Sequence, residues 1–245
     1  MIATIALRET LSTFRTPLAW LLLAAAQIVL TWILLQVLDD FTGLKPPERS
    51  AGLNLELSHN LFGSAAVFLM LTTPLLAARA ISGEMRDGVW QMLIAAPVTL
   101  SQILLGKFCA LAALVSLLCL IPLGLSLTLL GAAPIDPGLF LAATLGLWLT
   151  GLLFCAVGLF AASLSSQPAV ASVIALGLLM LISLVNRADH LAAARITMLD
   201  WLSWNQHLFW FLSGVVRVSD LTYFLLSSAL FLALAHRRLE NLRLG

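Results

Sequence analysis

Four histidines and one adjacent aspartate are the side chains of this sequence that could take part in catalysis. They are His59, His190, His207 and His236, with Asp189 directly before His190. Adjacent residues of a helix do not face each other, so Asp189 and His190 are poorly placed to act as a pair. The HExxH and GxSxG patterns are absent, and the histidines lack metal-ligand spacing. We therefore expect no catalytic residue, no metal site and no cofactor on this chain.

A dense cluster of charge lies in residues 84–97, between two apolar runs. Glu84, Arg86 and Asp87 precede Gly88, where the sequence predicts a turn. A helix-compatible run follows and ends at Pro97. Its apolar side chains are Val89, Trp90, Met92, Leu93 and Ile94. We expect them at the surface, which is typical either of docking to another protein or of a helix on lipid headgroups.

Composition places most of the chain in a membrane. Of its 245 residues, 61% are hydrophobic and 10% are charged, whereas soluble domains carry about 25% charged residues. A spanning helix needs roughly 20 apolar residues. Six runs are candidate spans: 18–38, 61–78, 103–130, 139–164, 169–185 and 221–235. We predict a single all-α membrane domain over residues 1–245. The net charge of +1 gives no reason to expect a nucleic-acid partner.

Two segments outside these spans have patterns of their own. In residues 1–17, Leu7 and Leu11 recur at helical spacing with Arg8 and Glu9 on other faces, and Pro17 ends the pattern. This predicts an interfacial helix. Residues 187–220 predict short helices at the outer leaflet, because the loop is rich in aromatic side chains of the kind that prefer that boundary. These are Trp201, Trp204, Phe209, Trp210 and Phe211. A substrate role is the alternative for them.

The distribution of charge predicts an orientation in which both termini face the cytoplasm. With six spans, the side of the termini carries most of the basic residues: Arg8, Arg15, Arg79, Arg86, Lys107, Arg237, Arg238 and Arg243. No charged residue lies deep in a predicted span, which argues against a carrier driven by protons. The sequence also lacks the phosphate-binding pattern GxxxxGK[ST], so an ATP-driven process would need a partner chain.

Residues 84–107 resemble the signature of ABC-2-type permeases, the membrane subunits of many bacterial ATP-driven exporters. That signature is roughly Glu-Arg/Lys-x-x-Gly-Thr-x-x-x-Leu-Leu-x-x-Pro-Val/Leu-Ser/Thr, followed after a few residues by Gly-Lys. The matching positions are Glu84, Arg86, Gly88, Met92, Leu93, Pro97, Val98, Thr99, Gly106 and Lys107. Val89 replaces the usual Thr, and Trp90 is unusually bulky.

Both ends of the chain extend the resemblance. Arg8-Glu9 and Thr16-Pro17 are similar to the helix that precedes the first span in this family. His207, Gly214, Asp220, Tyr223 and Phe224 resemble a subgroup that includes the gliding-motility F subunit and the permease of nitrous-oxide reductase maturation.

The resemblance implies a non-catalytic permease of an ABC transporter in the bacterial inner membrane, an exporter of unknown substrate. It implies a homodimer or heterodimer with a second permease, two soluble ATPase subunits that bind ATP and Mg²⁺, and room for a periplasmic accessory subunit. Residues 84–97 would be the coupling helix. Glu84, Arg86 and Asp87 would bind the ATPase through polar contacts, after a turn at Gly88. Val89, Met92 and Leu93 would fill its cleft, before Pro97 ends the helix.

Two other functions stay open from the sequence. An ATP-driven subunit could instead do mechanical work on periplasmic or surface machinery. Alternatively, the chain could be a scaffold or lipid scramblase that uses no ATP.

Overall fold

In the computed structural model, the described residues are 2–43, 52–88, 90, 99–131, 134–189 and 201–244. Helices account for nearly all of them, so the predicted all-α fold is confirmed for this part of the chain. The elements are α1 (Ile2–Arg15), α2 (Pro17–Gly43), α3 (Leu53–Leu57), η2 (Ser58–Phe62), α4 (Gly63–Ala78), η3 (Arg79–Gly83), α5 (Glu84–Arg86), α7 (Leu100–Leu127), α8 (Pro137–Leu164), α9 (Pro168–Asp189), α11 (Trp204–Leu212) and α12 (Val218–Leu244).

Five helical segments are long and apolar enough to cross a membrane. They are Pro17–Gly43, Leu53–Arg86, Leu100–Leu127, Pro137–Leu164 and Val218–Leu242. Each contains one of the predicted spans or most of it. The second is a continuous rod in which α3, α4 and α5 are joined by the π-helical turns η2 and η3. The remaining predicted span falls on α9, whose apolar part, Pro168–Leu184, is shorter. A full crossing by α9 stays a prediction.

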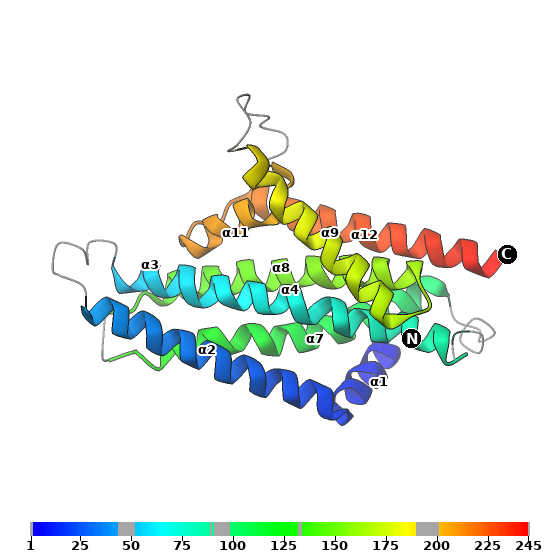
Figure 1. Cartoon of the computed structure of the whole chain (residues 1–245), viewed down its shortest axis with the longest axis horizontal. Helices are drawn as coiled ribbons and strands as arrows, with labels where there is room; N and C mark the ends of the chain where they lie inside the picture. The colour runs from blue at the N-terminus through cyan, green and yellow to red at the C-terminus, as the bar shows by residue number, and fades with distance from the viewer. Residues whose placement is uncertain are drawn as a thin grey trace.

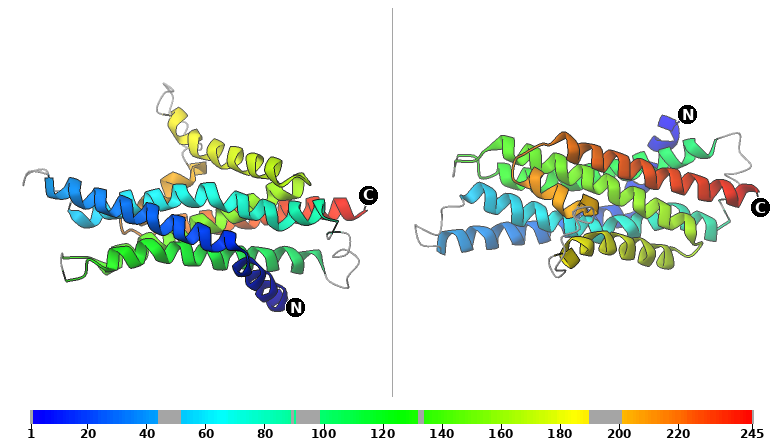
Figure 2. Two further views of the ribbon diagram at one scale, coloured as in Figure 1. Left: turned by 60° about the horizontal axis from the view of Figure 1, so that its bottom comes forward. Right: turned by 90° about the horizontal axis from the view of Figure 1, so that it is seen from above.

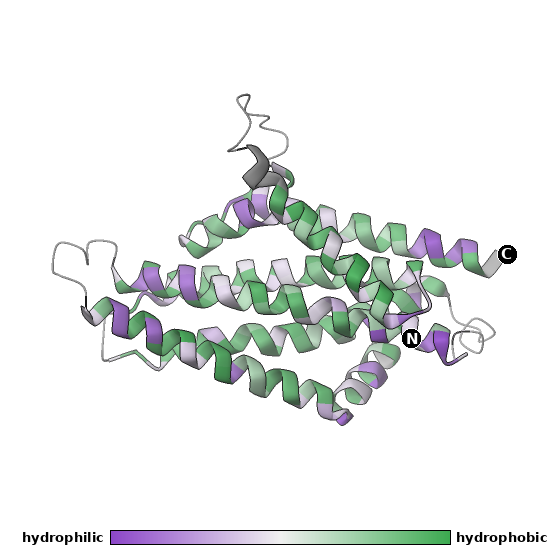
Figure 3. Cartoon of the chain, in the orientation of Figure 1, coloured by the Kyte–Doolittle hydropathy of each residue, from purple (hydrophilic) through white to green (hydrophobic). Residues whose placement is uncertain are grey.

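The long helices lie roughly parallel in one bundle, and both termini lie at the same end of it (Figure 1). We call this the terminal end. Helix α1 leaves the bundle at an angle before α2 begins at Pro17, and α9 diverges from the other helices along its length (Figures 1 and 2). Hydrophobic residues, drawn in green, make up most of the helices, while hydrophilic residues, drawn in purple, gather toward the helix ends (Figure 3). This distribution fits a bundle surrounded by lipid.

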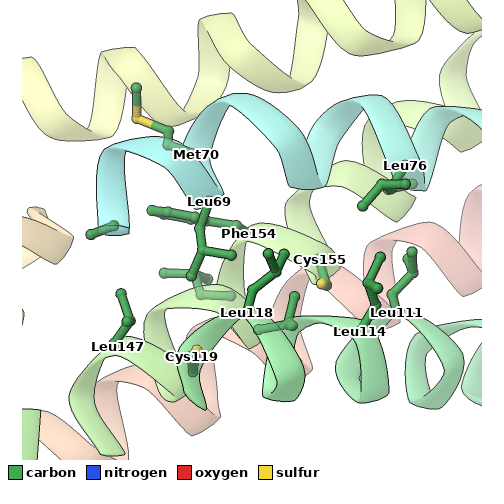
Figure 4. Close-up of a cluster of buried hydrophobic side chains, with 14 of the residues drawn as sticks. Leu69, Met70, Leu76, Leu111, Leu114, Leu118, Cys119, Leu147, Phe154 and Cys155 are labelled. Atoms are coloured by element: carbon green, nitrogen blue, oxygen red, sulfur yellow. The ribbon is translucent and has the colours of Figure 1, made fainter. Parts of the chain in front are cut away.

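Helix α8 is the centre of the packing. Phe154 on α8 meets Leu69 of α4 and Leu118 of α7 in the buried cluster of Figure 4. Glycines let neighbours come close: a Cβ on Gly146 would lie 2.3 Å from Cβ of Phe211, and one on Gly158 would lie 2.6 Å from Cβ of Ala77. Small residues at helix contacts compensate for the missing hydrophobic driving force between helices in lipid.

Helix α11 is packed into the protein, which differs from the expected helix at the outer leaflet. Phe211 is fully buried against α8, and Trp204 packs edge-on against Phe154 with ring centroids 5.0 Å apart. Ser58 Oγ donates a hydrogen bond of 2.6 Å to the carbonyl of Leu212. The aromatic side chains of Trp204 and Phe211 thus pack inside the protein, whereas those of Trp201 and Phe209 are about half exposed.

The outer helices present apolar side chains to the surroundings. On α2, Trp20, Ile28 and Trp32 are all more than 60% exposed, and Leu226 of α12 is 67% exposed. Such surfaces would be unfavourable in water but cost nothing against lipid tails or a neighbouring membrane helix.

Substituting Gly146 with Ala is expected to destabilise the protein, because the new methyl group would collide with Phe211. Overpacking of this kind costs about 1–3 kcal/mol. The measurement is the thermal unfolding midpoint of the purified protein in detergent. The matched control is Gly177→Ala on α9, where no atom lies within 4 Å of the added Cβ. Equal midpoints for the two variants would show that the contact between α8 and α11 is not close-packed.

Candidate functional site at the terminal end

A buried lysine at the start of α7 is the centre of the candidate site. Lys107 is 2% exposed, although it lies about two turns into a helix that has no other charged residue. Beside it, Gly106 allows α1 to approach, since a Cβ there would lie 2.6 Å from Cγ2 of Ile5. The close contact brings the polar face of α1 over the lysine. A charge this deeply buried is tolerated only when it is paired.

Two carboxylates from different elements pair with this lysine. The Nζ atom of Lys107 donates to Oε1 of Glu84 on α5 at 2.5 Å and to Oε1 of Glu9 on α1 at 3.2 Å. The side chain of Lys107 is 1% exposed, against 22% for Glu84 and 28% for Glu9. We call these three residues the Lys107 cluster. It joins α1, the end of the α3–α5 rod and the beginning of α7.

The Lys107 cluster closes the base of the loop between α5 and α7. Glu84 stands before residues 87–99 and Lys107 stands after them, so their ion pair ties the two flanks of this segment together. After α5 the chain turns at Gly88, whose φ of +75° is the left-handed conformation that glycine adopts without steric cost. A force on this loop would therefore act on three helical elements at once.

Glu84 has a different environment from the one expected for an ATPase contact. Its Oε1 bonds to Lys107, and its buried Oε2 has no hydrogen-bond partner among the described residues. Arg86 and Asp87 lie at the surface: their side chains are 71% and 69% exposed and their ion pair is long, at 3.9 Å. Their contact with an ATPase stays a prediction. Glu84 lies against Lys107 of α7, whereas Arg86 and Asp87, two and three residues further along the chain, are exposed.

The rest of the expected coupling helix lies outside the described residues. This holds for Val89, Met92, Leu93 and Pro97, and for Ile94 and Val98 beside them. Trp90 is described, and the expectation that it is exposed is wrong, because only 7% of it is accessible and it belongs to the buried core. Trp90 thus anchors the start of this segment to the bundle rather than presenting an indole ring to a partner.

A second polar cluster lies between α11 and α12. His207 bonds through Nδ1 to Oδ1 of Asp220 at 2.7 Å and through Nε2 to the carbonyl of Trp201 at 2.9 Å. Tyr223 stacks on the imidazole at 3.9 Å and donates its hydroxyl to the carbonyl of Leu202. These contacts fasten α11 and the segment before it to α12. They account structurally for residues that the sequence analysis singled out only by resemblance.

The described part of the chain contains no group of three or more His, Cys, Asp and Glu residues that could hold a metal ion. His190 and the side chain of Asp189 lie outside the described residues.

The link between Glu9 and Lys107 is the feature that sequence reasoning missed. The two residues are 98 positions apart, and nothing in either local pattern reveals the other. A signal was present in Lys107 itself, since a lysine placed past the first turn of an apolar helix needs a buried partner.

The apolar helical bundle, the small-residue contacts and the paired charge at one end define a multi-pass membrane protein. Residues 47–186 match the family described as ABC-2 family transporter protein. This range covers more than half of the chain, which therefore belongs to the ABC-2 transporter family and is a membrane permease subunit of an ABC transporter. The range contains Glu84 and Lys107 but ends before His207. No curated protein matches the chain.

Replacing Lys107 with Met is expected to destabilise the protein by about 3–5 kcal/mol, the usual cost of leaving a buried partner charge uncompensated. The measurement is the thermal midpoint in detergent, together with the rate at which a protease cleaves within α1. The control is Arg237→Met, which removes an exposed charge from the same end of the bundle.

The partner variant is Glu84→Gln. If the two residues form a true pair, the double variant is less destabilised than the sum of the single effects, with a coupling of about 0.5–3 kcal/mol. Strict additivity would contradict the ion pair.

Proposed function

We propose that this permease is driven by a separate ATPase subunit that pushes on the loop between Glu84 and Lys107. The observation that carries the proposal is the closed base of this loop. Because Glu84 and Lys107 are paired and Glu9 joins them, a displacement at the flanks of this loop would be passed to the α3–α5 rod, α7 and α1. ABC-2 permeases work with an ABC ATPase, and this attachment offers a mechanical route from that partner into the bilayer.

The exposed residues of the loop would make the contacts. Arg86 and Asp87 are available for ion pairs and hydrogen bonds with the ATPase. Beyond Gly88, we assign Met92 and Leu93, together with Val89, to an apolar cleft of the partner, with Pro97 ending the helix. We assign Glu84 to the Lys107 cluster rather than to the ATPase contact, since its carboxylate is already paired with Lys107.

The transport step would be mechanical, and no residue of this chain would do chemistry. ATP hydrolysis with Mg²⁺ on two partner ATPase subunits supplies the energy. Their closure displaces the loop, and the long helices carry that displacement into the membrane. Two permease protomers then move relative to each other and change access to a path between them. We propose export as the direction.

The proposed location is the bacterial inner membrane, with the terminal end in the cytoplasm. The basic residues support this orientation, since α1, the end of the α3–α5 rod, the beginning of α7 and the end of α12 belong to this end (Figure 1). These elements carry Arg8, Arg15, Arg79, Arg86, Lys107, Arg237 and Arg238. We further propose the subgroup related to the gliding-motility F subunit and the nitrous-oxide reductase maturation permease. Its support is the set of residues around His207 and Asp220, which hold α11 to α12.

The deciding experiment is a detergent pull-down of the tagged full-length chain from its native host, with ATP hydrolysis measured on the purified material. A stoichiometric soluble ATPase supports the proposal. A large periplasmic protein found together with that ATPase would favour mechanical work on external machinery. A preparation with neither an ATPase nor ATP turnover would contradict the proposal and indicate a scaffold or scramblase.

Two substitutions in the loop are expected to abolish stimulation of the ATPase while leaving the bundle folded. Met92→Asp places a charge in the predicted apolar contact. Gly88→Pro forces φ from +75° to about −65° and redirects the loop. The measurement is ATP hydrolysis by the reconstituted complex.

The matched control is Gly131→Pro. Gly131 has a φ of +93° and, like Gly88, open space around its Cβ position, but it lies in the connection between α7 and α8 at the opposite end. Its variant carries comparable backbone strain and should retain stimulation. Full stimulation with both loop variants would exclude this loop as the coupling element.

A further inference from the structure

A hollow at the terminal end lies between the end of the α3–α5 rod and the beginning of α9. It measures about 670 Å³, and its lining includes Arg79 and Arg86 on one side and Gln167, Pro168 and Ala169 on the other. Arg79 and Arg86 are both exposed. We propose that this hollow binds the phosphate headgroup of an anionic phospholipid from the surrounding membrane. The hollow shares Arg86 with the proposed ATPase contact, whereas Arg79 and the first turn of α9 lie outside the coupling loop.

The charge of the hollow is suited to an anion. Arg79 makes no ion pair with any described residue, while Arg86 is joined to Asp87 only by a long contact of 3.9 Å between exposed side chains. With Asp87 offsetting one arginine, the hollow keeps a net positive charge. A planar guanidinium offers paired N–H donors that match the oxygens of a phosphate.

The first turn of α9 adds backbone donors on the opposite side. By helix geometry, the N–H groups of Ala169 and Val170 have no carbonyl partner within α9, and Pro168 has no N–H at all. The N–H of Ala171 is already bonded to the carbonyl of Gln167. Free N–H groups and the positive end of the helix dipole favour a phosphate at this position.

The depth of Arg79 favours a lipid over a soluble anion. It lies five residues before Glu84, which is about 7.5 Å along a helix, and it directly follows the apolar helix α4. An exposed arginine at the boundary between an apolar span and a charged end lies where lipid phosphates are found. The side of a membrane rich in basic residues is also the side where anionic lipids are enriched.

An apolar surface continues from the hollow along α9. Val173, Leu181 and Leu184 are more than half exposed, and they recur at helical spacing with Val170 and Met180 on the outward side of this helix. Acyl chains attached to a headgroup in the hollow would lie along this surface. The short apolar length of α9 fits this arrangement, since a short span draws headgroups toward the membrane centre. Together, the cationic hollow and the apolar surface match both parts of one phospholipid.

The test compares phospholipids bound to the full-length protein in detergent, by native mass spectrometry during titration with phosphatidylglycerol or phosphatidylcholine. Wild-type protein should retain phosphatidylglycerol in preference to phosphatidylcholine. Arg79→Gln should weaken phosphatidylglycerol retention by about fivefold, the effect of one arginine at an anionic surface. Arg79→Lys should recover much of it. The control Arg237→Gln removes an exposed arginine of α12 and should leave retention unchanged.

Other outcomes would overturn the proposal. Equal retention by Arg79→Gln and Arg237→Gln would mean that lipid binding reflects overall charge. Displacement of phosphatidylglycerol by inorganic phosphate would show that the hollow binds the free anion rather than a lipid. Unchanged lipid retention together with loss of a copurifying ATPase in Arg79→Gln would assign the hollow to a protein interface. A normal gel-filtration profile of each variant verifies that it is folded.

Discussion

The burial of one positive charge shapes the terminal end of this permease. Lys107 lies within an apolar helix with almost no access to solvent, so its ammonium group must be neutralised from within the chain. Glu84 and Glu9 meet this requirement from two separate elements. The two ion pairs therefore link α1, α5 and the beginning of α7. Apolar packing of Ile5 against Gly106 joins α1 to α7 beside these ion pairs.

Packing inside the bundle follows a different principle. Along α8, glycines replace larger residues wherever a neighbour comes close, at Gly146 toward Phe211 and at Gly158 toward Ala77. In lipid the apolar side chains gain little from meeting each other rather than the acyl chains, so van der Waals contact at short distance must hold the helices together. This explains why α8 is buried along most of its length while α2 and α12 expose much of theirs.

The two ends of the bundle are fastened by different polar groups. At the terminal end a full ion pair joins elements that come from distant parts of the sequence. Near α11, His207 and Asp220 lie only 13 residues apart and hold a local turn of the chain together, with Tyr223 stacked on the imidazole ring. The first arrangement can transmit a displacement between helices. The contact between His207 and Asp220 holds α11 against α12, while Phe211 and Trp204 pack α11 against α8.

The sequence by itself determined the class of the protein, because long apolar runs and turn residues are local features. It placed five long helices, the turn at Gly88 and the residues of the ABC-2 signature, and the family match agrees with that assignment. It could not assign Glu84 to Lys107 or find Glu9, since the partners of a buried charge depend on which helices pack together. For the same reason it took Trp90 as exposed and α11 as a surface helix. Hydrophobicity reports that a side chain avoids water, but only the tertiary structure decides whether lipid, a partner or the chain itself covers it.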